Sequence, residues 1–266
     1  MLSFSKSELS NAALYGIVKM LEREGPARAG PFRLLLADAE GARRVTRFKQ
    51  KLESIVPRYA VVPLAVCLLF NILTYYGCRL LTRGRMFHEV ACAVDAAIPL
   101  FPPAIVIYVL TYVFWIVGFV VIARGGRESC FRNLAGEQTA KLLCIVCFLA
   151  FPTAMERPDV RGRDVFSWLT RLIYRLDDPN MLFPSIHCLD SWFCFRGAMR
   201  TKGTPRWYRV FAFVFALLVF ASTLLVKQHV FFDVLGGVVV LELGLFISNR
   251  LRAGRVYERL TPEGRR

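Results

Sequence analysis

Long apolar runs separated by short charged segments fill this chain from residue 57 onwards. A helix needs roughly 20 such residues to cross a hydrocarbon layer of about 30 Å. The pattern therefore predicts an all-α fold, a polytopic membrane protein built as a six-helix transmembrane bundle. The expected spans are residues 57–77, 99–123, 139–156, 185–199, 208–226 and 230–250.

The fourth expected span, residues 185–199, differs from the others. It is short, and it carries Asp190 and Arg196 inside its apolar run. Ionisable side chains within a membrane face other helices or a water-filled cavity. We therefore expect this helix to be buried among its neighbours or to line a wet cavity.

The chain divides into three expected regions. Residues 1–56 are charged and are broken by glycine-proline pairs, which predicts a cytoplasmic or interfacial segment with one or two short amphipathic helices. Residues 57–250 form the membrane bundle, and residues 251–266 form a basic cytoplasmic tail. We recognise no cleavable signal peptide in the first 20 residues, so the first span is expected to serve as the anchor.

Charge gives the expected orientation. The net charge is +15, and 25 of the 35 Lys and Arg residues lie on one side if the N-terminus is inside. This bias predicts a multi-pass protein of the cell membrane with both termini in the cytoplasm. Basic flanks facing anionic lipid explain the charge, and we find no nucleic-acid-binding motif.

The eight cysteines do not indicate a metal or redox centre. Most lie in apolar runs, where cysteine acts as a small hydrophobic residue. Cys144 and Cys147 form a CxxC pair, but no second pair accompanies it. The sequence leaves open whether Cys78 and Cys92 form a disulfide.

The strongest chemical signal runs from Ser222 to Asp233, at the border of two apolar spans. His229 and Asp233 are four residues apart, which places them on one face of a helix. A carboxylate that accepts the imidazole Nδ1–H leaves Nε2 free as a nucleophile or base. The alternative is a helix-end cap with an incidental ion pair.

Two further motifs are expected on the same side of the membrane. In Pro184-Ser185-Ile186-His187, Ser185 is the predicted N-cap, and the start of a helix attracts anions. In Arg157-Pro158, the guanidinium is suited to bidentate phosphate binding. A capped helix with an interfacial histidine, and an arginine that contacts lipid headgroups, are the respective alternatives.

Together these motifs resemble the signature of the phosphatidic acid phosphatase type 2 superfamily, which reads K-x6-R-P, P-S-G-H and S-R-x5-H-x3-D. The resemblance covers roughly residues 57–250 and includes the six-helix plan. This chain departs from the signature at Ala150, Ile186 and Thr223, where the family has Lys, Gly and Arg.

Two cationic positions of the family are thus vacant here. Lys141 is not expected to fill one, because about sixteen helical residues would place it near the opposite membrane face. The expected replacements are Lys227 and then Arg161, Arg163 or Arg171.

The resemblance implies the roles of the residues. His229 would attack phosphorus, Asp233 would orient it, and His187 would protonate the leaving group. The implied phosphate-binding residues are Arg157, Ser185, Lys227, Ser222 and Thr223, with Asp190 and Pro184 around them. No metal or other cofactor is expected.

The implied function is a phosphatase that hydrolyses a lipid phosphate or lipid diphosphate at the outer face of the membrane. One alternative is a lipid phosphotransferase that uses the same residues with an alcohol acceptor. A second is a non-catalytic lipid-binding protein, against which the intact His187, His229 and Asp233 argue.

Overall fold

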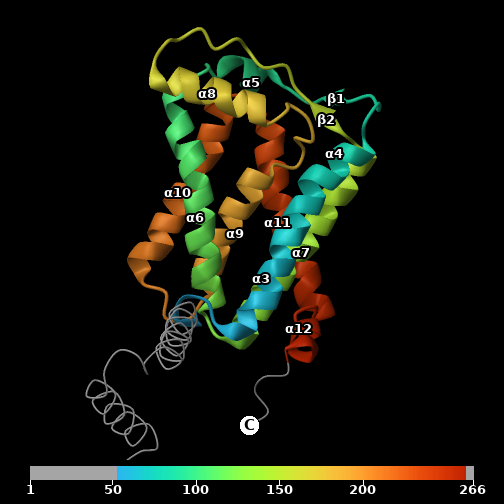
Figure 1. Ribbon diagram of the computed structural model, residues 1–266, viewed down its shortest axis with the longest axis vertical. Coiled ribbons are helices and arrows are strands. Elements are labelled where there is room, and N and C mark those ends of the chain that lie inside the picture. The colour runs from blue at the N-terminus through green and yellow to red at the C-terminus, as the bar shows by residue number, and fades with distance from the viewer. Residues whose placement is uncertain (1–52, 262–266) are drawn as a thin grey trace, which may run out of the picture. The chain divides into compact units, whose positions relative to one another are not determined.

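The computed structural model describes residues 53–261, which are mainly helical (Figure 1). Helices predominate because a chain inside lipid must satisfy its backbone N–H and C=O groups internally. In chain order the elements are α3 (Arg58–Ile72), η1 (Leu73–Gly77), α4 (Cys78–Leu81), β1 (His88–Glu89), α5 (Ala93–Ala97), η2 (Pro102–Ala104), α6 (Ile105–Ala123), α7 (Arg127–Ala150), β2 (Thr153–Ala154), α8 (Val165–Leu176), α9 (Ile186–Arg200), α10 (Arg206–Leu225), α11 (Phe231–Leu251) and α12 (Arg255–Leu260).

Five helical stretches in the described part of the chain are long and apolar enough to cross a membrane. The predicted helical membrane fold is confirmed at this level. The stretches are Arg58–Leu81, Pro102–Ala123, Arg127–Ala150, Arg206–Leu225 and Phe231–Leu251.

The expected count of six spans is not reached by this criterion. The remaining helix, α9, has only 15 residues, or about 22 Å of length. It packs against α6, α7, α10 and α11. Helix α9 is therefore buried among its neighbours. This was one of the two arrangements expected for residues 185–199.

The third span was predicted in the wrong place. The expected span was 139–156, but α7 begins at Arg127 and ends at Ala150, and an extended segment with β2 follows. The polar first half of α7 resembles a loop in hydropathy. Its polar residues are instead buried against other helices, among them Asn133, Glu137, Gln138 and Lys141.

A buried ion pair joins α7 to α9. Lys141 Nζ lies 2.7 Å from Asp190 Oδ2, 2.8 Å from Asn71 Oδ1 of α3 and 3.8 Å from Glu137 Oε1. The side chains of Lys141 and Glu137 are fully buried. Because α7 ends at Ala150, Lys141 lies about 14 Å from that end, in the middle of the bundle. The expectation that it lies near the opposite membrane face was wrong.

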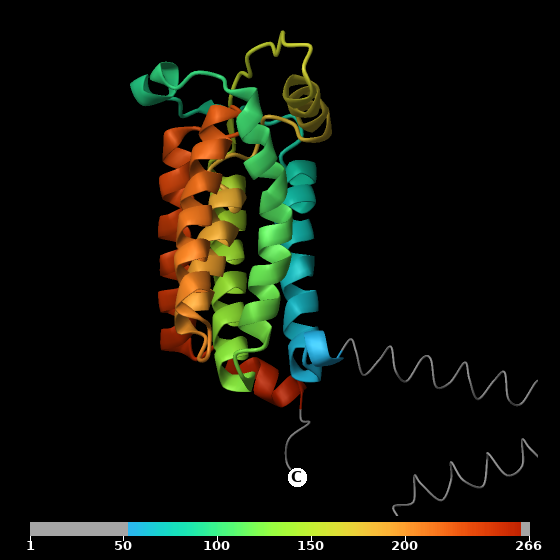
Figure 2. The ribbon, with the colours of Figure 1, turned by 90° about the vertical axis from the view of Figure 1, so that its left-hand side faces the viewer.

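The long helices stand side by side, with α7 at the centre of one group and α9 at the centre of the other (Figures 1 and 2). α7 packs mainly against α11 and α3, and α9 packs mainly against α10 and α6. The short helix α12 crosses one end of the bundle (Figure 2).

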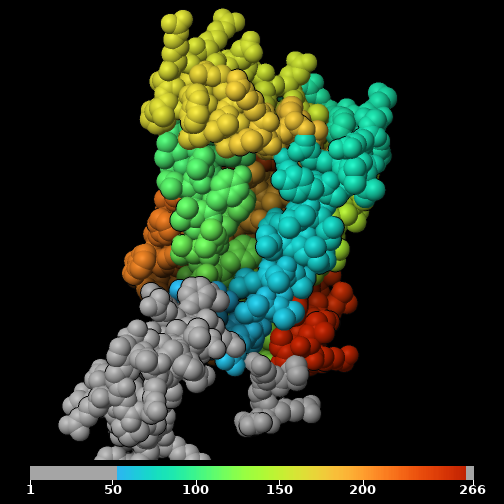
Figure 3. Space-filling view, viewed as in Figure 1, coloured from blue at the N-terminus to red at the C-terminus, as the bar shows by residue number. Residues whose placement is uncertain are grey.

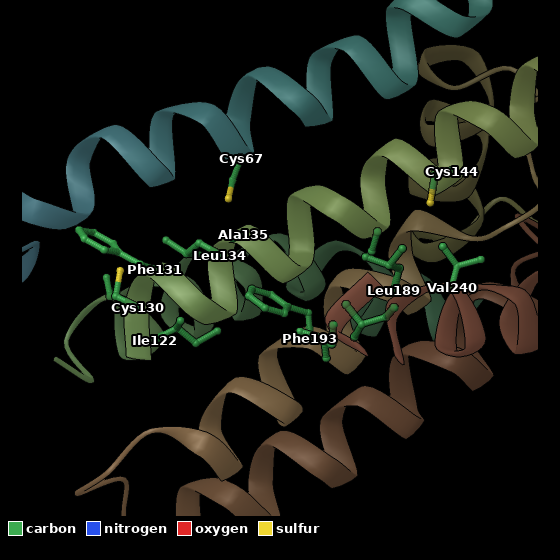
Figure 4. Packing of buried hydrophobic residues seen from close by; sticks show 14 of the residues in the cluster. Cys67, Ile122, Cys130, Phe131, Leu134, Ala135, Cys144, Leu189, Phe193 and Val240 are labelled. Carbon is green, nitrogen blue, oxygen red and sulfur yellow. The ribbon is translucent and has the colours of Figure 1, made fainter. Parts of the chain in front are cut away.

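The main hydrophobic core lies where α3, α7, α9 and α11 meet (Figure 4). Its side chains are mostly small or medium, such as Cys67, Ala135, Leu189 and Val240, with a few phenylalanines between them. Such residues let helices approach closely in a membrane. All eight cysteines are free thiols, so Cys78 and Cys92 do not pair.

The end of the bundle opposite α12 is covered by α8, which is yellow in Figure 3, and by the segments that carry β1 and β2 (Figure 1). β1 and β2 pair in parallel. Asp164 caps α8 by accepting hydrogen bonds from the backbone N–H groups of Phe166 and Ser167. α8 is amphipathic, with Trp168 exposed and Thr170 buried. An amphipathic helix at the end of a membrane bundle is suited to lie at the lipid surface.

The expected N-terminal region, residues 1–56, falls almost entirely outside the described residues. Of the expected tail, residues 251–266, the described part ends at 261 and includes α12.

The contact between α11 and α7 at Gly244 is expected to tolerate no added methyl group. A Cβ on Gly244 of α11 would lie 2.6 Å from the backbone N of Ala140 on α7. Gly244→Ala should therefore lower the free energy of unfolding by about 1–3 kcal/mol. Thermal and chemical unfolding followed by circular dichroism in detergent measures this.

Gly77→Ala is the matched control, because its added Cβ would meet only Leu73 Cδ2, at 4.0 Å. Alanine there should leave stability unchanged or raise it by up to about 1 kcal/mol. Equal destabilisation of both variants would contradict this account of the α7–α11 contact.

Breaking the buried ion pair should be more costly than removing both charges. Lys141→Met leaves the Asp190 and Glu137 carboxyl groups without a cation and should cost about 3–5 kcal/mol. The double variant Lys141→Met/Asp190→Asn should be less destabilised than Lys141→Met alone. A single variant as stable as the double variant would show that the pair does not hold α7 to α9.

Candidate active site

The structure brings three stretches of sequence together at one end of the bundle: the segment after α7, the start of α9, and the turn between α10 and α11. The backbone N–H of Ser185 donates to the carbonyl of Asp233 at 3.0 Å. Arg157 Nη2 donates to Gln228 Oε1 at 2.6 Å. The first bond links the start of α9 to the start of α11, and the second links the segment after α7 to the turn that carries His229.

His229 and Asp233 form a hydrogen-bonded pair at the start of α11. His229 Nδ1 lies 3.2 Å from Asp233 Oδ2, and the same oxygen accepts the backbone N–H of Val230 at 3.0 Å. Asp233 is fully buried, and His229 is 8% exposed. Asp233 therefore both caps α11 and orients the imidazole of His229.

The turn before His229 is shaped by hydrogen bonds to α10. The carbonyl of Thr223 accepts the backbone N–H groups of Gln228 and His229, while Lys227 adopts a φ of 52°. The hydroxyls of Ser222 and Thr223 donate to carbonyls within α10, each at 2.8 Å. Both side chains thus lie at the turn, with their protons directed to their own helix.

His187 lies in the first turn of α9, beside His229. The two ring centroids are 5.6 Å apart. Aromatic residues of α6 surround the His187 ring: Tyr108 stacks on it at 4.6 Å, and Trp115 lies at 5.3 Å. Its Nε2 has no hydrogen-bond partner in the described part of the chain. The imidazole is thus held by packing, with one nitrogen left unbonded.

Ser185 caps α9 as expected from its position. Its Oγ accepts the backbone N–H of Cys188 at 3.2 Å. Pro184 precedes it, and Phe183–Pro184 is a cis peptide bond. A Cβ on Gly237 would lie 2.6 Å from the Ser185 carbonyl oxygen, so only glycine lets α11 approach the start of α9 this closely.

Arg157 is buried against α8 and the turn. Its side chain is 7% exposed, its Nη1 donates to the carbonyl of Asp177 at 2.5 Å, and it lies 4.7 Å from the ring centroid of Tyr174. Burial lowers the pKa of the guanidinium from its ordinary value, and the Asp177 carboxylate acts in the opposite direction. The charge faces the turn in a largely dehydrated setting, where electrostatic interactions are strong.

Tyr174 ties α8 to the same turn. Its hydroxyl donates to the carbonyl of Val226 at 2.8 Å. Burial raises the pKa of Tyr174 to about 12, so the hydroxyl keeps its proton over the physiological range. The amphipathic helix α8 is therefore fixed to the loop that carries His229.

The structure does not bring the Lys227 ammonium to Arg157. Lys227 Nζ instead donates to the carbonyls of Asp95 and Ile98, at 2.8 and 2.5 Å. The Asp95 carboxylate in turn accepts the backbone N–H of Phe231 at 2.7 Å. Lys227 thus connects the α5 segment to the α10–α11 turn.

Asp190 lies on α9, about one helical turn after His187. It is bonded to Lys141 of α7, whereas Arg196 of the same helix binds Glu242. Asp177 and Asp178, which precede α9, are bonded to Tyr75 and Arg79 of the first membrane helix. No group of three or more His, Cys, Asp and Glu side chains within residues 53–261 is arranged to hold a metal ion.

A basic cavity of about 480 Å³ lies beside Arg157. Its lining includes Arg161, Arg171 and Arg175, together with Tyr174. Arg171 Nη1 donates to the carbonyls of Val160 and Gly162, so it also holds the loop before α8. The cavity concentrates positive charge next to the buried guanidinium.

Sequence reasoning missed Gln228 and the aromatic wall of α6. Gln228 is the polar residue between Lys227 and His229, and its place within the motif was the signal that could have identified it. Tyr108, Tyr112 and Trp115 gave no such signal, because aromatic residues are common in membrane spans. Only the packing of α6 against α9 reveals them.

Comparison with known proteins gives one family. The family model of the PAP2 (phosphatidic acid phosphatase type 2) superfamily matches residues 87–247, which is more than half of the 266 residues and includes the stretches that carry all three motifs. No curated protein and no solved structure matches the chain. The matched range contains the paired histidines, the buried Arg157 and the capped start of α9, and the chain therefore belongs to the PAP2 superfamily.

Proposed function

We propose that this protein is a membrane lipid-phosphate or lipid-diphosphate phosphatase that works through a phosphohistidine intermediate. The observation that carries the proposal is the pair His187–His229, with ring centroids 5.6 Å apart and Asp233 at Nδ1 of His229. Membership of the PAP2 superfamily supports a phosphatase-like lipid enzyme in general.

His229 is the proposed nucleophile. With its Nδ1–H donated to Asp233, the Nε2 lone pair is free to attack phosphorus. A bond forms between Nε2 and phosphorus while the bond from phosphorus to the leaving oxygen breaks. The Asp233 carboxylate stabilises the positive charge that develops on the imidazole.

His187 is the proposed acid and base. It gives a proton to the leaving oxygen in the first step and takes one from the attacking water in the second. The water oxygen then displaces Nε2 of His229 from phosphorus and releases phosphate. The aromatic residues around His187 support this assignment because they fix the ring without occupying Nε2.

Positive charge and N–H groups bind the phosphoryl oxygens in this proposal. Arg157 supplies the buried guanidinium, and the helix start at Ser185 supplies backbone donors that have no acceptor within the helix. With this charge in place the reaction needs no metal. Ser222, Thr223 and Lys227 are assigned to shaping and holding the turn, Asp190 to positioning α9, and Pro184 to its entry.

The substrate is proposed to approach from the lipid surface beside α8. The basic cavity next to Arg157 would attract an anionic headgroup from there. We propose that this end of the bundle faces the outer side and that both termini lie in the cytoplasm, which the Lys and Arg bias of the sequence supports.

Phosphate release in EDTA tests the proposal directly. Purified protein in detergent should release phosphate from at least one of phosphatidate, lysophosphatidate, phosphatidylglycerophosphate and undecaprenyl diphosphate. His229→Ala should lower the rate at least about 10⁴-fold, because the nucleophile is lost. His187→Ala should lower it about 10²–10⁴-fold.

His88→Ala is the matched control, because His88 is the third histidine of the chain and stacks on Phe151 outside the motifs. It should retain activity. No release from any of the four lipids, or release that His229→Ala leaves intact, would refute the phosphohistidine mechanism.

Arg157 and Gln228 should act as one unit. Gln228→Leu removes the acceptor of Arg157 Nη2 and should lower kcat/KM about tenfold. Arg157→Lys should lower it further, because lysine cannot form the same fork of hydrogen bonds. The effects in the double variant should be less than additive.

Arg163→Gln serves as the control for charge alone. Arg163 is exposed in the same segment and is not among the residues that line the cavity. Additive losses in the double variant, or an equal loss from Arg163→Gln, would argue against a specific Arg157–Gln228 unit.

A further inference from the structure

A second polar cluster joins α9 to α11, far from the histidines. Arg196 binds Glu242 through two nitrogens, with Nε 2.6 Å from Oε1 and Nη2 3.0 Å from Oε2. Trp192 Nε1 donates to Glu242 Oε1 at 2.9 Å. Arg196 and Arg200 lie about 14 and 20 Å along α9 from His187, so this cluster is separate from the candidate active site.

The cluster is exposed although its carboxylate, Glu242, lies on α11, a helix long enough to cross a membrane. Glu242 is about 16 Å from the start of α11, near its middle, yet its side chain is 39% exposed and that of Arg196 is 31% exposed. Ionised groups at this depth are costly unless they meet water or another polar group. Something polar must therefore reach this part of the surface in a bilayer.

A cavity of about 340 Å³ adjoins the ion pair. It is lined by Arg196, Arg200, Glu242, Phe246, Asn249 and Arg250. Three arginines face a single carboxylate, and that carboxylate is already bound by Arg196. Within residues 53–261, neither Arg200 nor Arg250 forms an ion pair, and Arg200 Nη1 is buried without a hydrogen-bond partner. Arg200 also lies within electrostatic reach of two arginines, Arg196 and Arg132, and of one carboxylate, Glu242. The cavity thus carries excess positive charge and an unused donor.

Apolar side chains of α9, α10 and α11 lie beside the arginines. Trp192 contacts Phe195 on α9 and Phe213 and Phe220 on α10, at centroid distances of 4.7, 6.2 and 6.1 Å. Phe246, exposed on α11, lies under the Arg250 guanidinium at 5.1 Å. Aromatic and aliphatic surface beside a cationic cavity is complementary to an amphiphile with a negative headgroup.

We propose that this cavity binds an anionic phospholipid, with its phosphate at Arg200 and Arg250 and its acyl chains along the exposed surface of α10 and α11. A phosphate oxygen would satisfy the unbonded Arg200 Nη1 and neutralise the charge that Glu242 leaves uncompensated. The lipid lies in the leaflet opposite the histidines and is a bound component of the fold rather than the substrate.

The test uses full-length protein in detergent, titrated with phosphatidylglycerol, with phosphatidylcholine or with inorganic phosphate, and read by thermal unfolding and native mass spectrometry. Phosphatidylglycerol should raise the unfolding temperature and remain bound. Arg200→Gln/Arg250→Gln should weaken its apparent Kd about tenfold or more.

Lys202→Gln/Arg206→Gln is the matched control. It removes the same charge from exposed positions at the same end that do not line the cavity, and it should change the apparent Kd less than about twofold. Equal losses in the two double variants would overturn the proposal. Equal stabilisation by phosphatidylcholine or by inorganic phosphate would do so too, since neither combines the charge with the chains.

Glu242→Gln gives a test in the opposite direction, which does not depend on losing arginines. Glu242 is the one carboxylate among the described residues that line the cavity. Its removal frees Arg196 for the headgroup, so phosphatidylglycerol should bind more tightly. Unchanged or weaker binding by this variant would overturn the proposal even where the arginine variants fail to fold.

Discussion

The ion pair between Lys141 and Asp190 is the contact on which the position of α9 depends. α9 is too short to be placed by the membrane itself, since its 15 residues do not reach across the hydrocarbon layer. A charge pair in a low-dielectric interior is strongly directional and has few alternative partners. The ion pair fixes how far α9 lies along α7 and which face of α9 points toward α7. His187 lies one helical turn from Asp190, so its position depends on the same contact.

Asp233 extends this control to the second histidine. One oxygen of its carboxylate accepts from Val230 and from His229, and its carbonyl accepts from Ser185. The start of α11, the orientation of the proposed nucleophile and the docking of α9 therefore share one residue. Substitution of Asp233 would disturb the fold and the chemistry together, so the histidines are better reporters of mechanism.

The sequence predicted what depends on local pattern. Apolar runs located most of the helices, and the spacing of His229 and Asp233 anticipated their hydrogen bond. It failed where tertiary packing decides. The first half of α7 resembles a loop because its polar side chains are buried against other helices, as where Gln138 donates to the carbonyl of Pro63 on α3. The bond from Arg157 to Gln228 joins residues 71 positions apart, and nothing in either segment specifies the other.

Helix α9 is held at three positions along its length, each by a polar contact of a different kind. A backbone hydrogen bond to Asp233 holds its start, the ion pair with Lys141 holds its middle, and the fork between Arg196 and Glu242 holds its far part. The first two contacts are buried. The third is exposed, and the arginines next to it lack counter-charges. The helix that presents His187 is thus secured by the protein at one end and depends on its lipid surroundings at the other.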